Sequence, residues 1–407
     1  MRYSQNGLRS ADAEDTLSLM KEVLLTTSLE VRFERRWIPC APFPYVLLHF
    51  TPNDGQPDEL YLGKGLNDNQ CMASAFMELI ERLCARIIDR GIMIEASYRE
   101  VKDYTRDPEK FVLPLNTPYS PDTRIDWVWG YSLTQEERVM VPANLVFYPY
   151  TADKPGKWIA GTDSNGLASG NCIEEAILHG IMEVIERDAR LIMEYNYMTM
   201  PDVEVDHLNS ETISHLLKNL EEAKIDVWIK DITNDIPVLS IGVFLRGLHE
   251  NAETMSYAVG TYIHPEIALS RALTEALQLY PRSFNYQQWL DSGPIDHLYA
   301  ESTRKTRLSA FANQSSIDLK ENINWCVQML KGFDAEVIVV DLSRPELIFS
   351  AVRVCITNLQ PIMYSQNPRI SKRLYDVPVT MGCRERALGL DDIKFRQILG
   401  YRQGIAV

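Results

Sequence analysis

No run of apolar residues in the sequence approaches the roughly 20 that a membrane-spanning helix needs, and the first residues, MRYSQNGLRSADAEDTL, lack the apolar core of a signal peptide. We therefore expect a cytoplasmic protein without a membrane-inserted segment. The seven cysteines are odd in number, scattered, and never spaced as Cys-x-x-Cys, which argues against a disulfide framework and a zinc site. Reduced, mostly buried thiols are the simplest interpretation.

Basic residues are also in deficit. Lys and Arg number 41 against 56 Asp and Glu, so the formal net charge is −15, which argues against general nucleic-acid binding. The sequence contains no Gly-x-x-x-x-Gly-Lys-Ser/Thr, no Gly-x-Gly-x-x-Gly and no kinase His-Arg-Asp. Any nucleotide must be bound by other means. The nucleophile elbow Gly-x-Ser-x-Gly and the metalloprotease motif His-Glu-x-x-His are missing too, which leaves hydrolase functions without support.

With 407 residues, 45% of them hydrophobic, the chain can bury a large core, as one elaborate domain or as two or three compact ones. Helical and strand-like periodicities alternate along it, which indicates an α/β fold. The patterns predict helices over Asp12–Leu25, Ser210–Ala223 and onward from His264, strands over Tyr45–Phe50, Trp127–Leu133, Val139–Tyr148, Asp226–Lys230, Pro237–Phe244, Glu336–Asp341 and Val352–Thr357, and an irregular polar loop over Ser283–Ile317.

An internal repeat is the most informative feature. A shift of 105 residues (181 − 76) places FMELIER, Phe76–Arg82, onto IMEVIER, Ile181–Arg187. Each block follows a glycine-bearing approach, GKGL at Gly63–Leu66 and SNGLASG at Ser164–Gly170. Each also begins with a pattern typical of a capping box. The predicted capping pairs are Asn67 with Gln70 and Asn171 with Glu174.

The first repeated helix has an ordinary explanation when taken alone. Glu78, Glu81 and Arg82 fall on one face, opposite an apolar stripe. Glu78 and Arg82 would then form an exposed i, i+4 ion pair on a solvated face, worth about 0.2–0.5 kcal/mol. This helix by itself favours that interpretation over a functional one.

The second repeated helix points to chemistry. Apolar residues occupy most of its circumference, so it should be largely buried, and buried carboxylates need a cation, a metal or dense hydrogen bonding. Clustered carboxylates suit Mg²⁺, with arginine neutralising phosphate. A single polar stripe runs along this helix: Glu175, His179, Glu183, Glu186 and Arg187.

Two weaker signals remain open. His179 lies between Glu175 and Glu183 at four-residue spacing and could indicate a transition-metal site, although a structural histidine is the more common explanation. The third helix carries Arg271, Glu275 and Gln278 on one face and would be unremarkable by itself.

Three blocks together, GKGLNDNQCMASAFMELIER, SNGLASGNCIEEAILHGIMEVIERDA and GTYIHPEIALSRALTEALQ, resemble the YcaO family over about residues 55 to 390. The resemblance implies an α/β fold with internally repeated, helix-bearing halves and mixed sheets around a central ATP site. It divides the chain into an N-terminal α/β segment, 1–55, that contributes to the nucleotide site and a YcaO domain, 56–407, with the pseudo-repeat at about 60–90 and 165–195.

The resemblance also implies residue roles. Helix carboxylates bind ATP through Mg²⁺ in this family, so Glu78, Glu81, Glu183 and Glu186 are the expected metal ligands, and Glu183, Glu186 and Arg187 the expected catalytic residues. Further expected nucleotide contacts, besides Arg187 as a phosphate ligand, are Arg9, Thr16, Ser74, Asn171, Glu175, Arg271 and Glu275. A departure occurs at Tyr280, where the family often has arginine; Arg282 is a candidate replacement.

The family activates a peptide-backbone amide with ATP and forms an azoline, a thioamide or an amidine. The end of the chain, YRQGIAV, lacks the proline-rich tail of many azoline formers, which favours installation of a thioamide on a protein or ribosomally made peptide, with a TfuA-like partner, a sulfide source and a homodimer. Alternatives are an azoline-forming cyclodehydratase of peptide Cys, Ser or Thr, and a non-catalytic ATP-binding accessory protein.

Overall fold

The computed structural model describes residues 2–4, 7–38, 40–52, 57–153, 156–249, 252–282, 296–362 and 368–389. The chain forms two compact units, each assembled from separate stretches. The first unit comprises Met1–Leu79, Met193–Ile317 and Gly389–Val407, and the second comprises Ile80–Ile192 and Asp318–Leu388. The expected division at residue 55 follows family resemblance rather than compactness and stays a prediction.

A small antiparallel sheet and the first two helices build one part of the first unit. The sheet has the order β3-β4-β5, with β3 Glu30–Arg36, β4 Tyr45–Thr51 and β5 Glu59–Gly63, so the predicted strand at Tyr45 is confirmed. Helix α1, Ala13–Thr27, confirms the first predicted helix, and the Asp12 carboxylate caps it by accepting from the Asp15 N–H at 2.9 Å. The remaining elements are β1 Arg2–Ser4, β2 Gly7–Arg9 and α2 Asp68–Cys84.

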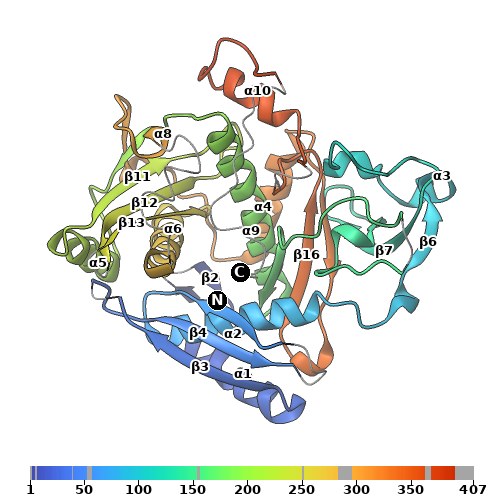
Figure 1. Ribbon diagram of the computed structural model, residues 1–407, viewed down its shortest axis with the longest axis horizontal. Coiled ribbons are helices and arrows are strands. Elements are labelled where there is room, and N and C mark those ends of the chain that lie inside the picture. Colours follow the sequence, from blue (N-terminus) through green and yellow to red (C-terminus); the bar gives the residue numbers. More distant parts are fainter. Residues whose placement is uncertain are drawn as a thin grey trace. The chain divides into compact units, whose positions relative to one another are not determined.

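A five-stranded sheet forms the rest of the first unit, in the order β13-β12-β11-β10-β14. Every pairing is antiparallel except the one between β10 and β14. Helices α5 and α6 lie beside this sheet (Figure 1). The bounds are β10 Asp202–Glu204, α5 Glu211–Glu222, β11 Asp226–Asp231, β12 Ser240–His249, β13 Ala252–Thr261, α6 Pro265–Leu279, η5 Tyr280–Arg282, α8 Asp296–Tyr299, β14 Lys305–Arg307 and η6 Leu308–Ala310.

Two predictions in this region have different outcomes. Helix α6 begins at Pro265 after the N-cap residue His264, as expected from the preference of proline for the first helical turn. The predicted irregular loop over Ser283–Ile317 is only partly right for its described part, in which short elements alternate with irregular backbone. There β14 pairs with β10, so a tertiary strand partner orders a segment whose own pattern is polar. Residues 283–295 lie outside the described residues.

The second unit contains a six-stranded antiparallel sheet. Its strand order is β6-β7-β15-β16-β9, with β8 also paired to β7. The predicted strand Val139–Tyr148 is too long, because β8 ends at Pro142, which cannot donate a ladder hydrogen bond, and a short 3₁₀ turn follows. The strands are β6 Ile94–Ser97, β7 Arg124–Ser132, β8 Glu137–Pro142, β9 Leu167–Gly170, β15 Val337–Asp341 and β16 Ser350–Ile356.

Helices complete the second unit. In the described part of the chain, none of them is both long and apolar enough to cross a membrane. The longest is α4, Ile173–Tyr195, whose last turn continues into the first unit. The others are η1 Arg90–Ile92, α3 Tyr98–Val101, η2 Lys102–Tyr104, η3 Pro108–Phe111, η4 Ala143–Leu145, α9 Leu319–Lys331, η7 Pro345–Leu347 and α10 Arg373–Thr380.

The glycines of the repeat permit close packing between a strand and the helix that follows it. Strand β5 ends at Gly63 before α2, and β9 ends at Gly170 before α4. A Cβ atom on Gly63 would lie 1.8 Å from the carbonyl oxygen of Cys71, and one on Gly170 would lie 2.7 Å from the amide nitrogen of Ala176. The repeat is therefore a strand–glycine–helix unit present twice.

A buried lysine in the second unit gives a first prediction. Lys157 is 4% exposed, and its Nζ lies 2.6 Å from the carboxylate of Asp126, itself 5% exposed. We expect Lys157→Met to lower the free energy of unfolding by about 3 kcal/mol, because the ammonium also pairs with Glu95 and Asp153, and its loss leaves the buried Asp126 only the more distant Arg90, at 3.6 Å. Urea unfolding measures this, with Lys218→Met as the control, since that lysine is 70% exposed in its pair with Glu222. Equal small losses in both variants would contradict the assignment.

Candidate functional site

The three motif helices differ from the others in burial. Over their wholly described ranges, no residue of α2, α4 or α6 is exposed, whereas α1, α5, α9 and α10 each present exposed residues. Charged side chains nevertheless lie along all three. A buried charge is tolerated only when other groups compensate it, so these helices carry the strongest structural indication of a functional site.

The solvated-face interpretation of α2 is wrong. The Arg82 side chain is only 12% exposed and its guanidinium lies over the ring of Tyr148, 5.1 Å from the centroid. The same guanidinium lies 3.7 Å from the carboxylate of Glu81. The Glu78 carboxylate accepts a hydrogen bond at 3.0 Å from the N–H of Leu62 in β5. Tertiary cover, which a single helix pattern cannot reveal, buries this face.

The second helix of the repeat, α4, is buried as its apolar composition predicts. In α4, Nη2 of Arg187 lies 3.5 Å from Glu183, and Nη1 of the same guanidinium lies 3.5 Å from Glu186. Glu186 is 4% exposed and the Glu183 side chain 16%. Burial raises the pKa of Glu183 above its ordinary value, and Glu186 adds to this, whereas Arg187 and Arg82 act in the opposite direction. The arginines therefore compensate the carboxylate charge only in part.

The beginning of α4 lies one residue later than the expected capping box implies. The helix starts at Ile173, so Asn171 lies one residue before the N-cap position, and the Glu174 carboxylate lies 3.5 Å from Nζ of Lys320. The Asn171 side-chain amide approaches the carboxylate of Glu175, at 3.4 Å. In the first box the Gln70 N–H donates to the Asn67 side chain at 2.9 Å, as predicted, and the Gln70 side chain accepts from the Leu66 N–H at 2.8 Å.

Glu275 on helix α6 has an ion-pair partner, Lys64, that the sequence did not suggest. Arg271 and Glu275 are half-buried one turn apart, and the Glu275 carboxylate forms an ion pair with Lys64, the lysine of the GKGL approach. The two partners are 211 residues apart in sequence, and each side chain is about one quarter exposed (26% and 24%). Proximity to the repeat was the only sequence signal available for Lys64.

The remaining expected nucleotide contacts all belong to the first unit. Thr16 is buried in α1 and donates its hydroxyl to the Asp12 carbonyl at 2.9 Å, and its oxygen can still accept. Ser74 is half-buried on α2, one turn before Glu78, and Arg9 is half-buried at the end of β2. Tyr280 is buried, and the side chain of Arg282 lies outside the described residues.

The donor chemistry of the site fits Mg²⁺, which prefers carboxylate oxygen. Glu81, Glu183 and Glu186 are such donors in the second unit, and the raised pKa of Glu183 means that burial disfavours its ionised form, which a bound cation would stabilise. Among the described residues, however, no three His, Cys, Asp or Glu side chains already converge as a metal site would require. The transition-metal interpretation of His179 therefore gains no support from the described residues.

A buried aspartate anchors α4 directly beside Arg187. Asp188 is fully buried, and its carboxylate accepts from the Gln360 N–H at 2.7 Å and from Nε and Nη2 of Arg373 at 2.9 and 2.7 Å. Gln360 in turn accepts from the N–H and hydroxyl of Ser371. Asp188 thus positions the helix turn that carries Arg187.

Substitution of Asp188 tests this anchor. We expect Asp188→Asn to lower the free energy of unfolding by about 3 kcal/mol, because it removes the fully buried negative charge that faces the Arg373 guanidinium, whose side chain is only 12% exposed. Arg373→Lys keeps the charge and forfeits the bidentate geometry, so its loss should be smaller, about 1 kcal/mol. Chemical denaturation of the two variants measures the difference. A tolerated Asp188→Asn would show that the hydrogen bonds, and not the charge, hold the turn.

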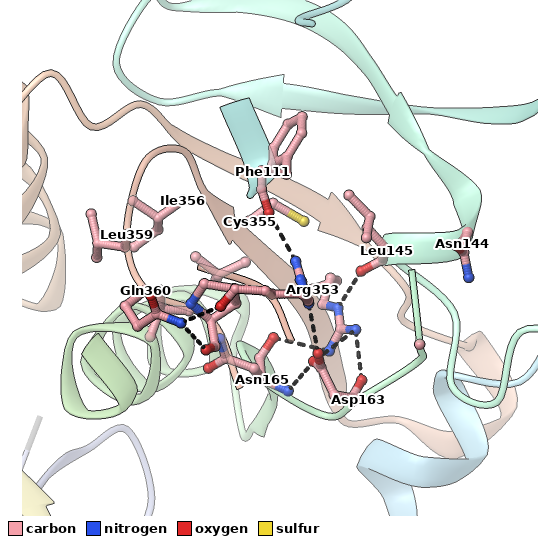
Figure 2. A pocket seen from close by; sticks show the side chains of 15 residues that line it. Phe111, Asn144, Leu145, Asp163, Asn165, Arg353, Cys355, Ile356, Leu359 and Gln360 are labelled. Carbon is pink, nitrogen blue, oxygen red and sulfur yellow. Dashed lines mark hydrogen bonds and ion pairs between the residues drawn. The ribbon is translucent and has the colours of Figure 1, made fainter. Parts of the chain in front are cut away.

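A small cavity of about 50 Å³ adjoins α4 at Val184 (Figure 2). Arg353, 2% exposed, dominates it and donates to the carbonyls of Leu145, Asp163 and Asn165 at 2.8, 2.7 and 3.0 Å. Figure 2 shows the guanidinium fixed among these oxygens. The size suits about one or two water molecules, so this cavity is part of the scaffold and not a nucleotide pocket.

Comparison with known proteins gives a consistent result. The family model described as YcaO cyclodehydratase, ATP- and Mg²⁺-binding, matches residues 62–360. An uncharacterized protein of Methanothermobacter thermautotrophicus is 36% identical over 343 residues, which cover 80% of this chain and 87% of that one. A relative from Rhizobium leguminosarum bv. trifolii, described as an uncharacterized protein in the tfuA 3′ region, is 24% identical over 77% of this chain and 80% of its own.

Solved structures share the fold. A heterocyclase in complex with substrate and cofactor superposes with a TM-score of 0.85 at 23% identity over 98% of this chain, which spans only 59% of the heterocyclase. YcaO from Methanopyrus kandleri, bound with AMPPCP and Mg²⁺, superposes with a TM-score of 0.69 at 24% identity over 88% of this chain and 94% of that one. The mixed α/β fold and the cofactors ATP and Mg²⁺ are thereby confirmed at the level of the family. The chain belongs to the YcaO family of ATP-dependent, cyclodehydratase-like enzymes.

Proposed function

We propose that this protein activates a peptide-backbone amide with ATP and installs a thioamide. The observation that carries the proposal is a largely buried set of two arginines and three carboxylates contributed by α2 and α4 in the second unit: Glu81, Arg82, Glu183, Glu186 and Arg187. Phosphoryl transfer needs mainly positioning and charge neutralisation, which such a set provides.

The proposed residue roles are those that the family resemblance implies, and the charges of the helix residues fit them. Glu78, Glu81, Glu183 and Glu186 would bind Mg²⁺, which when bound neutralises phosphate charge and orients the transferred group. Arg187, loosely paired at 3.5 Å to both Glu183 and Glu186, can move to a phosphate oxygen once those carboxylates have another cation. The other proposed nucleotide contacts are Arg9, Thr16, Ser74, Asn171, Glu175, Arg271 and Glu275.

The proposed reaction balances without a redox partner. Sulfide adds to the amide carbonyl carbon, and the resulting oxyanion attacks the γ-phosphorus of ATP with departure of ADP. Loss of the thiol proton and of inorganic phosphate then leaves the carbon–sulfur double bond. The amide oxygen therefore leaves in the phosphate. The protein's part is to orient the two reactants and compensate charge that develops on the phosphoryl oxygens.

The choice of sulfide as nucleophile is supported by the relative from the tfuA 3′ region. The heterocyclase that shares the fold supports a second candidate, closure of an azoline by a neighbouring Cys, Ser or Thr of the peptide. A TfuA-like partner, a sulfide donor, a homodimer and a cytoplasmic location are further parts of the thioamide proposal.

Product mass separates the candidates. With ATP, Mg²⁺, sulfide and a candidate peptide, a thioamide product is heavier than the peptide by the exchange of oxygen for sulfur, whereas an azoline is lighter by one water. Phosphate release with neither product would count against both. The accessory role is tested with the Glu183→Gln variant in the cell. If this variant still supports modification by another enzyme, the accessory role is favoured over catalysis.

A further inference from the structure

Strands β10 and β11 of the first unit are joined at a single residue pair. Asp202 pairs with Lys230, and beside this pair the Asp231 N–H donates to the Pro201 carbonyl at 2.9 Å. On its other side, β11 pairs with β12 along all six of its residues. Continued in the same register, β10 would place Val205 opposite Val227, but the described residues show no pairing there. The two strands therefore diverge.

An apolar groove of about 430 Å³ opens where the strands diverge. Helix α5, beside β11 in Figure 1, contributes Leu217 to it. We call this the β10–β11 groove. Its apolar lining consists of Val203, Val205, Leu217, Ile225, Val227 and Ile229.

The backbone of β11 presents hydrogen-bonding groups to the same groove. Backbone groups of alternate residues point to the same edge of a strand. Because the Asp231 N–H points toward β10, the N–H and C=O of Val227 also point to that edge. Among the described residues, no backbone hydrogen bond reaches Val227 from this side. An unpaired strand edge is a template for another extended chain.

The rim of the groove is mainly acidic. Glu221 and Asp226 are exposed groove-lining residues and Lys224 is the one basic residue among them. Glu204, at the end of β10, adds a further exposed carboxylate, although Lys305 lies 3.8 Å from it. A ligand with basic side chains would therefore complement this rim better than an acidic one.

We propose that the β10–β11 groove binds an extended peptide segment that adds a strand to β11, with apolar residues at alternate positions and basic residues between them. Alternate side chains of an added strand enter one face, where Val227 and Ile229 already lie, and its backbone pairs with Val227. This binding needs neither ATP nor amide activation, so it goes beyond the proposed reaction and fails or succeeds separately from it.

Fluorescence anisotropy tests the proposal on the full chain without nucleotide. The probe is a fluorescein-labelled nonapeptide of alternating valine and lysine, at about physiological ionic strength to suppress non-specific attraction. We expect saturable binding that Val205→Arg and Leu217→Arg each weaken by about tenfold or more. The matched control is Leu248→Arg, a 70% exposed leucine on β12 of the same sheet, which should leave binding unchanged.

A modified probe tests the strand pairing without altering the protein. N-methylation of every second peptide amide keeps charge and side chains but removes the edge hydrogen bonds, and should weaken binding about tenfold. The unmodified probe should also slow hydrogen exchange at the Val227 amide. Equal binding of both probes, or unaltered exchange at Val227, would overturn the proposal. Sedimentation gives a further test. If the protein is a dimer and Leu217→Arg converts it to a monomer, the groove is occupied by a second copy of the chain, which would also overturn the proposal.

Discussion

Glu183→Gln is expected to reduce ATP turnover by at least about 100-fold while leaving the protein folded. Glutamine has the shape of glutamate but lacks the negative charge that would bind Mg²⁺ and balance Arg187. Because burial raises the pKa of Glu183, ionisation of this side chain destabilises the metal-free folded state as pH rises from the ordinary value of 4.5 through the raised value. The neutral variant avoids that loss, so its unfolding free energy should not fall.

Steady-state phosphate release and urea unfolding measure the two halves of this prediction. The control is Glu222→Gln on α5, whose side chain is 65% exposed and should affect neither quantity. Undiminished turnover by Glu183→Gln would remove this carboxylate from the proposed site. A large loss of stability would instead mean that the carboxylate mainly supports the fold.

Arg187→Lys is expected to lower kcat by about 1000-fold, within the range found when an arginine that stabilises a transferred phosphoryl group is lost. Lysine keeps the positive charge but cannot reproduce the planar, two-pronged guanidinium that here reaches Glu183 and Glu186. A residue active mainly in the transition state should change kcat far more than the KM for ATP.

Single-turnover kinetics with ATP distinguish this role from simple binding. The matched control is Arg99→Lys, an exposed arginine whose Nε lies 2.7 Å from Asp122 and whose loss should not alter kcat. A rise in KM with kcat preserved would assign Arg187 to ground-state binding and contradict its place in phosphoryl transfer.

Composition alone predicted the burial of α4 but misjudged α2. Apolar residues of α4 occupy nearly its whole circumference, so the helix must be covered on all sides, and Glu183 and Glu186 are covered with it. Helix α2 has one clearly polar face, and such a face is ordinarily solvated. What covers it includes the ring of Tyr148, a contact between residues 66 positions apart (148 − 82) that no local pattern encodes.

Partners distant in sequence account for most of what could not be predicted. Lys64 meets Glu275, and Asp188 meets Arg373, only after the chain has folded. Helix α9, by contrast, has a readable pattern. Asp318 caps it, and Ile323, Cys326, Val327 and Leu330 recur at helical spacing, so its absence from the predicted elements reflects a missed signal rather than a missing one.

The fate of the amide oxygen tests the central claim most directly. The reaction is run with ATP, Mg²⁺, sulfide and peptide in water enriched in heavy oxygen, and the inorganic phosphate is analysed by mass spectrometry. If the peptide amide attacks ATP, the phosphate formed together with product takes its new oxygen from the peptide and stays free of the solvent label. Phosphate that carries one solvent oxygen per product would mean that water attacks ATP, and would contradict amide activation at the Glu183 and Arg187 site.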